Sequence, residues 1–404
     1  MMQICFFTEN FYKGGLDTFL INLVNAWPDE NDELTLVCNA SHPGIETIEN
    51  KTTRALSITR YTENNFINLL QGRDGAKYLR STLARRFFVL IQYLILFPWY
   101  VLRLTVFFWR SEFDRLMVVN GGYPASLRCR CAAIAWRLSG KQRLAVFNFH
   151  NSATMPPRFL GLFEYTIDKI LAWSSSKFVS VSKDCLDSLQ DRKVFLNKSN
   201  VSFIYNGIED PVETISNNNT LRHTIKNEQY CLLLATYESR KGHFYLLEAF
   251  KSVVNDFPAV HLYIYGDGKD YEKKRITDQV KSLKLENNVS LNDFTPDTGS
   301  LIANASVIVV PSQAYESFGL TIIEAMAFGV PVVATDVGGI PEVLANSGAG
   351  YVCSKEDPLE FSVAIKKILG NPPLALKLGL AGRKSFESKF MATKMAANYR
   401  ILLK

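Results

Sequence analysis

The densest group of residues that could do chemistry lies in the segment 310–344, which reads VPSQAYESFGLTIIEAMAFGVPVVATDVGGIPEVL. The pattern predicts a strand that ends at Pro311, a loop that carries Glu316, and a helix from about Leu320 to Phe328 that is closed by Gly329. The loop leads backbone N–H groups into the start of a helix, where an anion such as a phosphate is stabilised.

Two carboxylates, Glu316 on the loop and Glu324 on the helix, flank this anion site. They are eight residues apart, so they lie within about 80° of each other on a helical wheel and can face one ligand. Carboxylates accept hydrogen bonds from pairs of hydroxyl groups, while the amides at the helix start bind a diphosphate. The pattern predicts a sugar-nucleotide site; the alternative is a solvated Glu324 beside an ordinary loop glutamate.

Basic residues that could neutralise a diphosphate lie in the segment 236–242, which reads TYESRKG. Arg240 and Lys241 would stabilise the negative charge that develops on a leaving diphosphate, which is the largest catalytic contribution available without a metal. The chain contains no D-x-D pair, the motif with which metal-dependent sugar transferases hold a divalent ion. We therefore expect transfer without a metal; two ordinary surface cations are the alternative.

Two further candidates lie in the first half of the chain. The Gly14-Gly15 turn follows a predicted strand and would let the backbone approach a phosphate or an acceptor, unless its role is purely structural. His150 follows another predicted strand, where we expect it to hydrogen-bond the donor sugar and position the acceptor; a structural histidine is the alternative. Gly266-Asp267-Gly268 lacks the third glycine of a dinucleotide fingerprint and is interpreted as a tight turn beside the base pocket.

A regular alternation of strands and helices must position these residues. It forms two runs, as in parallel α/β sheets. The strands predicted in the first run are Gln3–Thr8, Leu34–Cys38, Leu116–Val119, Leu144–Phe149, Phe178–Val181 and Ser202–Tyr205. Those predicted in the second run are Tyr230–Ala235, Val260–Tyr265, Val289–Leu291, Ser306–Val310 and Pro331–Thr335. The pattern predicts two Rossmann-like domains that face a cleft, with ligands at the carboxyl ends of the strands.

The chain resembles the retaining GT-B glycosyltransferases of family 4. Glu316 and Glu324 match the E-x7-E motif of that family, including its E-S-F-G-L start and its E-A-M-A-x-G-x-P-V-V continuation. The resemblance extends from the Gly14-Gly15 loop to the last helix; it is strong in residues 230–345 and loose in residues 40–115. It implies an α/β protein of the GT-B class.

The resemblance also implies roles for the candidate residues. Glu316 would hold the donor sugar near its C3 and C4 hydroxyls, and Glu324 would hold the ribose hydroxyls. Lys241 matches a lysine of the family, but the arginine expected five positions earlier is Thr236, so Arg240 is the candidate substitute. His150 matches the family's strand-end histidine on the acceptor side. The predicted catalytic residues are Glu316, His150 and Lys241, and the predicted donor-binding residues are Gly15, Arg240, Lys241, Glu324 and the amides of Phe318, Gly319 and Leu320.

The resemblance divides the chain into three parts. Residues 1–205 would form the acceptor-side domain, residues 206–385 the donor-binding domain, and residues 386–404 a helix that crosses back to the first domain. Glu342, after Gly338-Gly339, is either a further donor contact or a solvated glutamate.

The charge of the chain is unevenly distributed. The whole sequence of 404 residues has a net charge of +6, too small to indicate a nucleic-acid partner. Residues 71–143 hold 13 basic and three acidic residues, so this segment carries +10 and the remainder −4.

The seven cysteines form no C-x-x-C pair and lie mostly in apolar surroundings, and no signal peptide precedes the first strand. These features favour a reducing, cytoplasmic compartment.

An apolar stretch lies inside this basic region. Phe87–Leu102 reads FFVLIQYLILFPWYVL, and Gln92 is its only strongly polar residue. As a helix it would span roughly 24 Å, which is shorter than a hydrocarbon core of ~30 Å, and Pro98 would kink it. A single crossing would also put the Gly14-Gly15 loop and His150 on opposite sides of the membrane.

We therefore predict a membrane-associating segment at about residues 75–115, a helix or helical hairpin that dips into one leaflet. Its interfacial residues would be Trp99, Tyr100 and Trp109, and the arginines of the basic region 71–143 would contact anionic headgroups. The alternative is a buried helix pair with arginines on its solvated side.

The main functional hypothesis is a retaining glycosyltransferase of the hexosyl or N-acetylhexosaminyl type (EC 2.4). It would move a sugar from a nucleotide-sugar donor, with a UDP-sugar favoured, to a hydroxyl of a polyprenyl-diphosphate-linked or other saccharide in bacterial O-antigen, capsule or exopolysaccharide synthesis. We expect a peripheral protein on the inner face of the cytoplasmic membrane, with no cofactor, metal or nucleic acid. The alternatives are a catalytically silent GT-B scaffold in a polysaccharide assembly complex, for which Thr236 leaves room, and a nucleotide-sugar epimerase.

Overall fold

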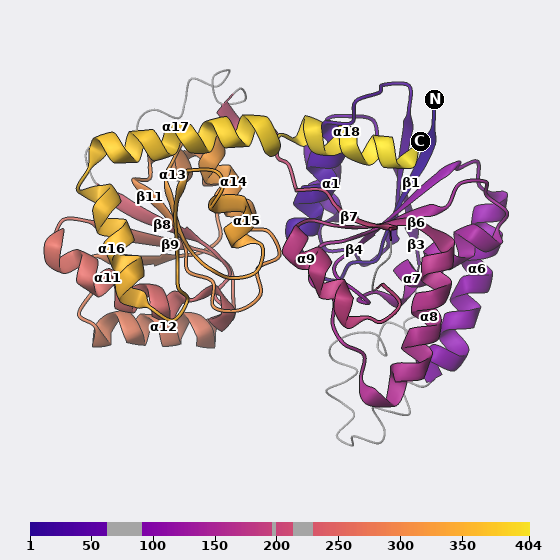
Figure 1. The fold of residues 1–404 in the computed structure, drawn as a ribbon, viewed down its shortest axis with the longest axis horizontal. Helices are drawn as coiled ribbons and strands as arrows, with labels where there is room; N and C mark the ends of the chain where they lie inside the picture. Colours follow the sequence, from indigo (N-terminus) through magenta and orange to yellow (C-terminus); the bar gives the residue numbers. More distant parts are fainter. Residues whose placement is uncertain (63–90, 196–198, 213–228) are drawn as a thin grey trace. The chain divides into compact units, whose positions relative to one another are not determined.

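The computed structural model describes residues 1–62, 91–195, 199–212 and 229–404. The chain divides into two compact units, one formed by residues 1–204 with 395–404 and the other by residues 205–394. Each unit contains one parallel sheet (Figure 1). The basic residues from Arg73 to Arg86 and the start of the apolar stretch lie outside the described residues.

The sheet of the first unit has the strand order β3-β2-β1-β4-β5-β6-β7 and is parallel throughout. Its strands are β1 (Gln3–Thr8), β2 (Glu33–Asn39), β3 (Ser57–Tyr61), β4 (Arg115–Asn120), β5 (Ala145–Phe149), β6 (Ser175–Ser180) and β7 (Val201–Phe203). Alternate side chains enter opposite cores: Ile4 and Phe6 pack on one side of β1, and Cys5 and Phe7 pack on the other. This explains why the central strands are continuously apolar.

Helices connect these strands and cover both faces of the sheet. The α-helices are α1 (Gly15–Asn25), α2 (Ile45–Lys51), α6 (Phe97–Arg110), α7 (Leu127–Leu138), α8 (Gly161–Ser174) and α9 (Lys183–Asp187). A π-helical stretch, η1 (Gln92–Leu96), leads directly into α6, and two short 3₁₀ turns are η2 (Arg158–Leu160) and η3 (Ser188–Asp191).

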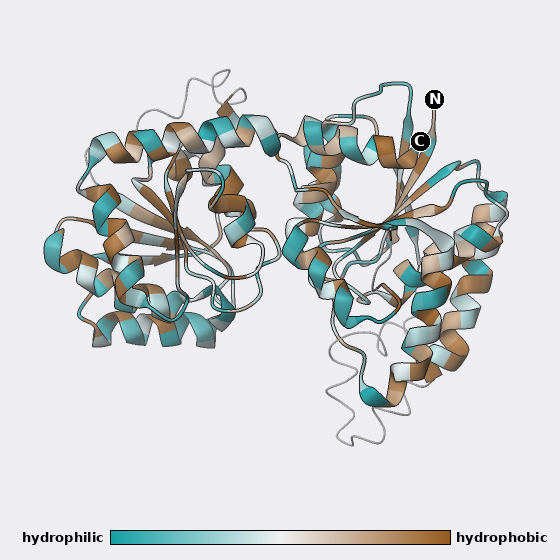
Figure 2. Cartoon of the chain, viewed as in Figure 1, coloured by the Kyte–Doolittle hydropathy of each residue, from teal (hydrophilic) through white to brown (hydrophobic). Residues whose placement is uncertain are grey.

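The sheet of the second unit has the strand order β10-β9-β8-β11-β12-β13 and is also parallel. Its strands are β8 (Tyr230–Leu234), β9 (His261–Tyr265), β10 (Val289–Asn292), β11 (Val307–Val310), β12 (Val332–Thr335) and β13 (Gly350–Cys353). Its helices are η4 (Ser239–Lys241), α11 (His243–Asp256), α12 (Asp270–Ser282), α13 (Thr298–Asn304), α14 (Leu320–Ala327), α15 (Ile340–Leu344), α16 (Pro358–Leu369) and α17 (Pro372–Lys389). In both sheets the central strands are strongly hydrophobic (Figure 2).

The last helix, α18 (Ala392–Leu403), packs mainly on the first unit. Tyr399 is fully buried, and its hydroxyl accepts a hydrogen bond of 2.7 Å from the Asn148 side chain. The Arg400 guanidinium forms an ion pair of 2.7 Å with the buried Asp32 carboxylate. These contacts attach the end of the chain to the same core as its first strand.

The apolar segment around residue 100 lies against α7, so part of the membrane prediction is wrong. Tyr100 is buried, and its hydroxyl accepts a 2.9 Å hydrogen bond from Arg128, so it is unavailable to an interface. Arg128 also pairs with the buried Glu9 at 3.0 Å, and Arg130 pairs with Glu164 at 2.8 Å, so neither arginine can reach a headgroup. Pairing with distant carboxylates in the core explains why a count of local charge misplaced them.

Pro98 lies at the start of α6, directly after the π-helical stretch η1. Proline has no N–H to donate within a continuous helix, so the kink at Pro98 stays a prediction. Among the residues that the structure describes, no helix combines the length and the apolar character needed to span a bilayer.

Candidate functional site

The loop between β11 and α14 is the centre of the candidate site in the second unit. Gly319 caps α14 in the left-handed conformation, with a φ of 87°, which glycine adopts at little cost. The Phe318 ring before it is buried against the rings of Tyr205 and Phe390. The start of α14 is thereby fixed, and its first N–H groups, which have no intrahelical acceptor, face the end of the loop.

A glycine turn supports the backbone of Glu316. The Glu316 carbonyl oxygen accepts a 2.8 Å hydrogen bond from the N–H of Gly339. Gly338 has a φ of 58°, and a Cβ atom at this position would lie 2.2 Å from the same carbonyl oxygen. Only a glycine allows this approach, so the Gly338-Gly339 turn determines where Glu316 stands.

The Glu316 side chain is bound by a cation from another segment. The Lys241 ammonium donates a hydrogen bond of 2.5 Å to Glu316 Oε2, and both side chains are about one-fifth exposed, at 20% and 17%. The Ser312 hydroxyl lies 3.4 Å from the same oxygen. A charge-assisted bond of this length holds the carboxylate in one orientation.

Backbone contacts bring the segment of Lys241 to this loop. The carbonyl oxygen of Arg240 accepts a 2.8 Å hydrogen bond from the N–H of Gln313. Gly242 has a φ of 76°, and a Cβ atom there would lie 1.7 Å from the carbonyl oxygen of Pro311. The two segments follow the neighbouring strands β8 and β11, whose carboxyl ends meet at one edge of the sheet.

Arg240, the candidate substitute for a missing arginine, is already engaged. Its Nε lies 2.7 Å from a Glu238 carboxylate oxygen, and its guanidinium lies 5.3 Å from the centre of the Tyr315 ring. Thr236 is exposed at the start of the same segment. Arg240 is therefore next to the Lys241 site but paired within its own loop.

Glu324 lies on α14, one turn after the helix start, and is half-buried. Burial raises the pKa of this carboxyl to about 7, because the charged form loses hydration that no cation replaces. A group with this pKa can change its protonation state when a ligand offers hydrogen-bond donors.

Two contacts of the second unit lie around these residues. The Tyr205 hydroxyl is hydrogen-bonded to Glu342, so this glutamate is not simply solvated. The Gly266–Gly268 turn packs on the segment after β8, with the carbonyl oxygen of Asp267 accepting a 2.8 Å hydrogen bond from the N–H of Tyr237.

In the first unit, Gly15 begins α1, which residues 9–14 connect to β1. The carboxylate of Asp17, in the first turn of α1, accepts a 3.0 Å hydrogen bond from the N–H of Gly14 and a 3.3 Å bond from the Asn10 side chain. Asp17 is buried and lies 3.5 Å from the Nε2 atom of His42. Asp17 is the third residue after the helix cap Gly14, a position where a carboxylate is a capping signal that can be read from the sequence.

His150 follows β5 directly and is only 9% exposed. Its ring lies 4.3 Å from that of Phe19 of α1, and no described residue hydrogen-bonds its Nε2 atom. Burial lowers the pKa of His150 to about 3, so the ring is neutral at physiological pH. It can donate or accept a hydrogen bond but does not act as a cation.

The predicted residues thus form two groups, each in its own unit. The second unit brings the predicted donor-side residues to the carboxyl edge of its sheet: Arg240, Lys241, Glu316, Phe318, Gly319, Leu320 and Glu324. The first unit links Gly15 and His150 through Phe19 on α1.

In comparison with known proteins, a family model matches most of the second unit. Residues 218–385 match the family described as "Glycosyl transferases group 1". The N-acetyl-alpha-D-glucosaminyl L-malate synthase of Bacillus anthracis is 24% identical over 279 residues, which are 67% of this chain and 70% of that protein. The capsular polysaccharide biosynthesis glycosyltransferase CapM of Staphylococcus aureus is 27% identical over 238 residues, or 56% of this chain and 60% of CapM.

A solved structure is similar over nearly the whole chain. The HepE protein of Anabaena in complex with UDP has a TM-score of 0.72 and 18% sequence identity, and the match covers 100% of this chain and 99% of HepE. The same protein has been solved with UDP-glucose, with a TM-score of 0.71 and 17% identity. At such low identity the likeness concerns the fold, which consists of two parallel Rossmann-like sheets.

Proposed function

Because the chain belongs to the glycosyl transferases of group 1 and has their GT-B fold, we propose that it transfers a sugar, with retention of anomeric configuration, from a UDP-sugar to a hydroxyl of a lipid-linked saccharide. The observation that carries this proposal is the Lys241–Glu316 pair of 2.5 Å at the start of α14. It combines a carboxylate for sugar hydroxyls, a cation for a diphosphate, and a helix N-terminus for the same anion.

Each donor-side residue then has a chemical task. Glu316 accepts hydrogen bonds from the hydroxyls of the donor sugar, and Glu324 accepts them from the ribose. The first amides of α14 and the Lys241 ammonium bind the diphosphate; Lys241 can serve the donor because its partner Glu316 gains the sugar hydroxyls in exchange. Arg240 adds positive charge beside them.

The transfer needs no strong protein base. The bond from the anomeric carbon to the diphosphate oxygen breaks, and a bond from that carbon to the acceptor oxygen forms on the same face. The acceptor proton passes to an oxygen of the departing UDP. Lys241 and the amides of α14 stabilise the charge on UDP, a contribution worth about 10²–10³ in rate for one well-placed donor.

Within residues 1–205, we assign His150 to the acceptor side and Gly15 to donor binding. A neutral His150 hydrogen-bonds the donor sugar and positions the acceptor without adding charge, and the Gly14-Gly15 backbone allows a phosphate of the donor to approach closely. Residues 206–385 form the donor half, and residues 386–404 return to the first unit.

The pathway part of the proposal is bacterial surface polysaccharide synthesis, with a polyprenyl-diphosphate saccharide as acceptor. The name of the CapM relative and the apolar, basic character of the segment around α6 support it. The protein would then work peripherally at the inner face of the cytoplasmic membrane.

The test begins with a thermal-shift screen of nucleotide sugars, since a bound donor stabilises the folded chain. The best donor is then incubated with a short-chain polyprenyl-diphosphate saccharide, and the anomer of the product is determined by NMR. We expect a retained anomer from the wild type and a strong loss with Glu316→Ala. An inverted product, or donor binding without turnover on any acceptor, would overturn the proposal, and the latter result would favour a silent scaffold.

A further inference from the structure

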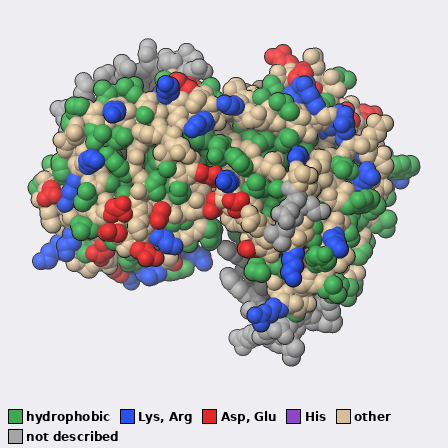
Figure 3. All heavy atoms as spheres, viewed as in Figure 1, with side chains coloured by type: hydrophobic (Ala, Val, Ile, Leu, Met, Phe, Trp, Pro, Cys, Tyr) green, Lys and Arg blue, Asp and Glu red, His purple; other side chains and the backbone are tan. Residues whose placement is uncertain are grey.

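Large exposed apolar side chains gather on two helices of the first unit. They lie on η1 with α6 and on α8, and they are between 37% and 79% exposed: Leu94, Ile95, Trp99, Leu102, Val106 and Trp109, together with Leu162, Phe163, Tyr165, Ile170 and Trp173. We call these residues the α6–α8 surface. Figure 3 shows hydrophobic and basic side chains at the surface in this region.

The two helices lie beside each other although 50 residues, 111–160, separate them in sequence (Figure 1). The nearly fully buried α7 packs against both. The Tyr93 hydroxyl of η1 is hydrogen-bonded to Glu164 of α8, which joins them directly. The exposed residues of both helices therefore belong to one continuous side of the unit.

Helix α6 has apolar side chains on both of its sides. Tyr100 and Phe108 pack inward, while Trp99, Leu102 and Val106 face outward at helical spacing. The outward side also carries the exposed arginines of α6, Arg103 and Arg110. A helix side that combines large apolar residues with cations is typical of helices that lie in a membrane interface.

Cations predominate among the exposed charges on this side. Arg103, Arg110, Arg158 and Lys169 are exposed among the apolar residues. The two carboxylates of α8, Glu164 and Asp168, instead point into the core, where they pair with Arg130 and Arg192. Within the described residues 91–110 and 158–174, no carboxylate is exposed, and Glu112 is exposed just beyond the end of α6. An apolar surface in which cations predominate is complementary to anionic lipid headgroups.

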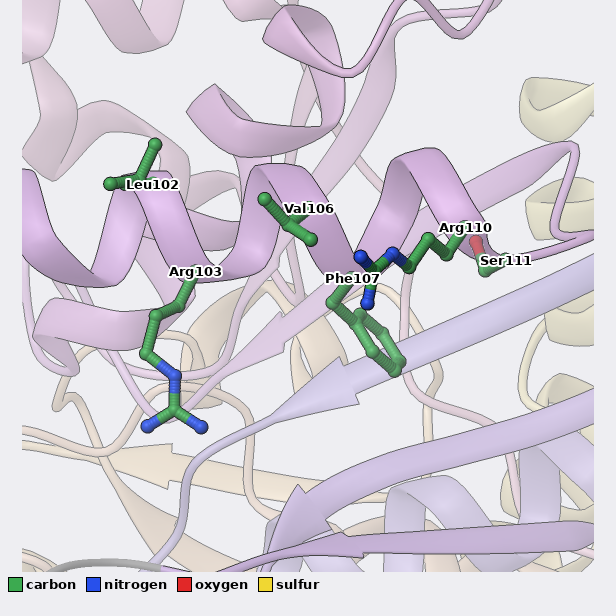
Figure 4. Close-up of a pocket in the computed structure, with 6 residues that line it drawn as sticks. All are labelled: Leu102, Arg103, Val106, Phe107, Arg110 and Ser111. Atoms are coloured by element: carbon green, nitrogen blue, oxygen red, sulfur yellow. The ribbon is translucent and has the colours of Figure 1, made fainter.

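A groove along α6 adds a specific feature. It is open, has a volume of about 560 Å³, and is lined by Leu102, Arg103, Val106, Phe107, Arg110 and Ser111 (Figure 4). The two arginines lie seven residues apart on the same side of the helix, with apolar side chains between them. Guanidinium groups bind phosphate oxygens in a bidentate manner, so the groove suits a lipid phosphate with its chain against Val106 and Phe107.

The tryptophans of this surface have a distinctive environment. The chain has five, and Trp27 and Trp136 are buried at 4% and 0% exposure. The three others, Trp99, Trp109 and Trp173, all belong to the α6–α8 surface. Arg103 lies 4.8 Å over the Trp99 ring, and Arg137 lies 5.1 Å over the Trp173 ring. Amphipathic aromatic rings beside cations are typical of residues at the level of headgroups.

We infer that the α6–α8 surface docks the first unit on an anionic phospholipid bilayer, with Arg103 and Arg110 holding a headgroup phosphate in the α6 groove. This inference rests on the proposed function for its biological setting and deepens it, because it adds α8, which local sequence hydrophobicity and charge did not indicate. The helices lie flat on the headgroup layer, and the buried side of α6 stays on α7.

The direct test is vesicle flotation of the full chain. The probe is a vesicle of phosphatidylglycerol and phosphatidylcholine in equal parts, and the comparison is a vesicle of phosphatidylcholine alone. We expect binding to the first that weakens with salt, and quenching of tryptophan fluorescence by lipids brominated near the headgroup. Absence of binding to anionic vesicles would overturn the inference. A dimer in light scattering would then show that a second copy of the chain covers the surface.

Variants separate the contributions of the two helices. Leu102→Ser with Trp109→Ser removes apolar area from α6, and Leu162→Ser with Trp173→Ser removes it from α8; we expect each pair to weaken vesicle binding at least tenfold. Arg103→Gln with Arg110→Gln should lower binding to anionic vesicles by about 30-fold and leave the weak neutral-vesicle binding unchanged. The matched control is Leu376→Ser with Leu380→Ser on α17, whose side chains are 65% and 64% exposed. If the double variant on α8 bound anionic vesicles as tightly as the wild type, α8 would not be part of the docking surface.

The design keeps this inference separate from the proposed function. Release of UDP from a soluble UDP-sugar, measured without lipid, should be equal in the wild type and all surface variants. If no variant and no wild-type protein turns over a donor, the proposed function fails while the vesicle result still stands. If turnover is normal but vesicles do not bind, only the docking inference fails.

Discussion

Lys241 and Glu316 form a 2.5 Å ion pair between two segments that follow neighbouring parallel strands, β8 and β11. The pair joins the two residues with the largest expected roles in handling the diphosphate and the sugar. Each partner neutralises the other in the free protein. Donor binding must therefore replace the ion pair by two new interactions, one between Lys241 and the diphosphate and one between Glu316 and the sugar hydroxyls. The two side chains therefore act as one unit.

This coupling predicts that their substitutions are not additive. Lys241→Met and Glu316→Gln should each lower the rate of transfer about 100-fold, and the double variant should lose little more than the worse single variant. The measurement is kcat for the best donor in a double-mutant cycle. The control is the pair Lys274→Met and Glu356→Gln, two exposed residues away from the site, which should leave kcat unchanged. Additive losses would mean that the two residues act independently.

The Gly338 turn predicts a loss of activity without direct contact to the donor. Gly338→Ala places a Cβ atom 2.2 Å from the Glu316 carbonyl oxygen, so the loop must move. Gly329→Ala has the same positive-φ strain but only ordinary contacts at 3.6 Å, which makes it the matched control. Both variants should lose about 1 kcal/mol or more of unfolding free energy. Only Gly338→Ala should also lower kcat; equal kcat in the two variants would contradict the role of the turn.

The pKa of about 7 at Glu324 predicts that donor binding releases a proton. Burial raises this pKa above its unfolded value, so the neutral form is favoured below pH 7, whereas ribose hydroxyls favour the ionised form. The affinity for UDP-glucose should therefore weaken about tenfold between pH 8 and pH 6. Calorimetry in buffers of different ionisation enthalpy measures the released proton. Glu324→Gln should bind weakly at both values with no proton release, and proton release as large as that of the wild type would contradict the assignment.

The buried network around Glu164 predicts acid-dependent stability in the first unit. Burial alone would raise the pKa of Glu164, but Arg130, Tyr93 and Arg192 outweigh it and hold the pKa at about 2. Since this value is below the unfolded one, the stabilisation is present above about pH 4.5 and is lost as the pH falls toward 2. At pH 7 Glu164→Gln should cost about 3 kcal/mol in urea unfolding, with the exposed Glu46→Gln as control. A difference that stays constant down to pH 3 would contradict this account.

Much of the fold was predictable because buried parallel strands are continuous apolar runs. The strands β1, β4 and β11 were expected within one or two residues of their bounds. The strands β3 and β13 were missed, since each lies at a sheet edge and is partly exposed, which removes the apolar run. The family prediction, based on the E-x7-E motif, is confirmed by the match of residues 218–385.

The sequence named candidate site residues one by one but not their arrangement, and their roles stay predictions. The motif marked Glu316 and Lys241 separately, whereas their contact depends on β8 and β11 being neighbours, which the order of strands along the chain does not reveal. The same limit explains the error at Arg128 and Arg130. Their carboxylate partners, Glu9 and Glu164, lie far away in sequence, so counting local charge could not show that these arginines are neutralised in the core.

The central claim is that Lys241, paired with Glu316, serves the departure of UDP from a bound sugar nucleotide. The most direct measurement is the rate of UDP release from a panel of UDP-sugars by the purified wild type and by Lys241→Met. We predict measurable release from at least one donor by the wild type and a rate about 100-fold lower in the variant, with the fold unchanged by circular dichroism. Equal rates in the two proteins, or no release by the wild type from any donor it binds, would contradict the claim.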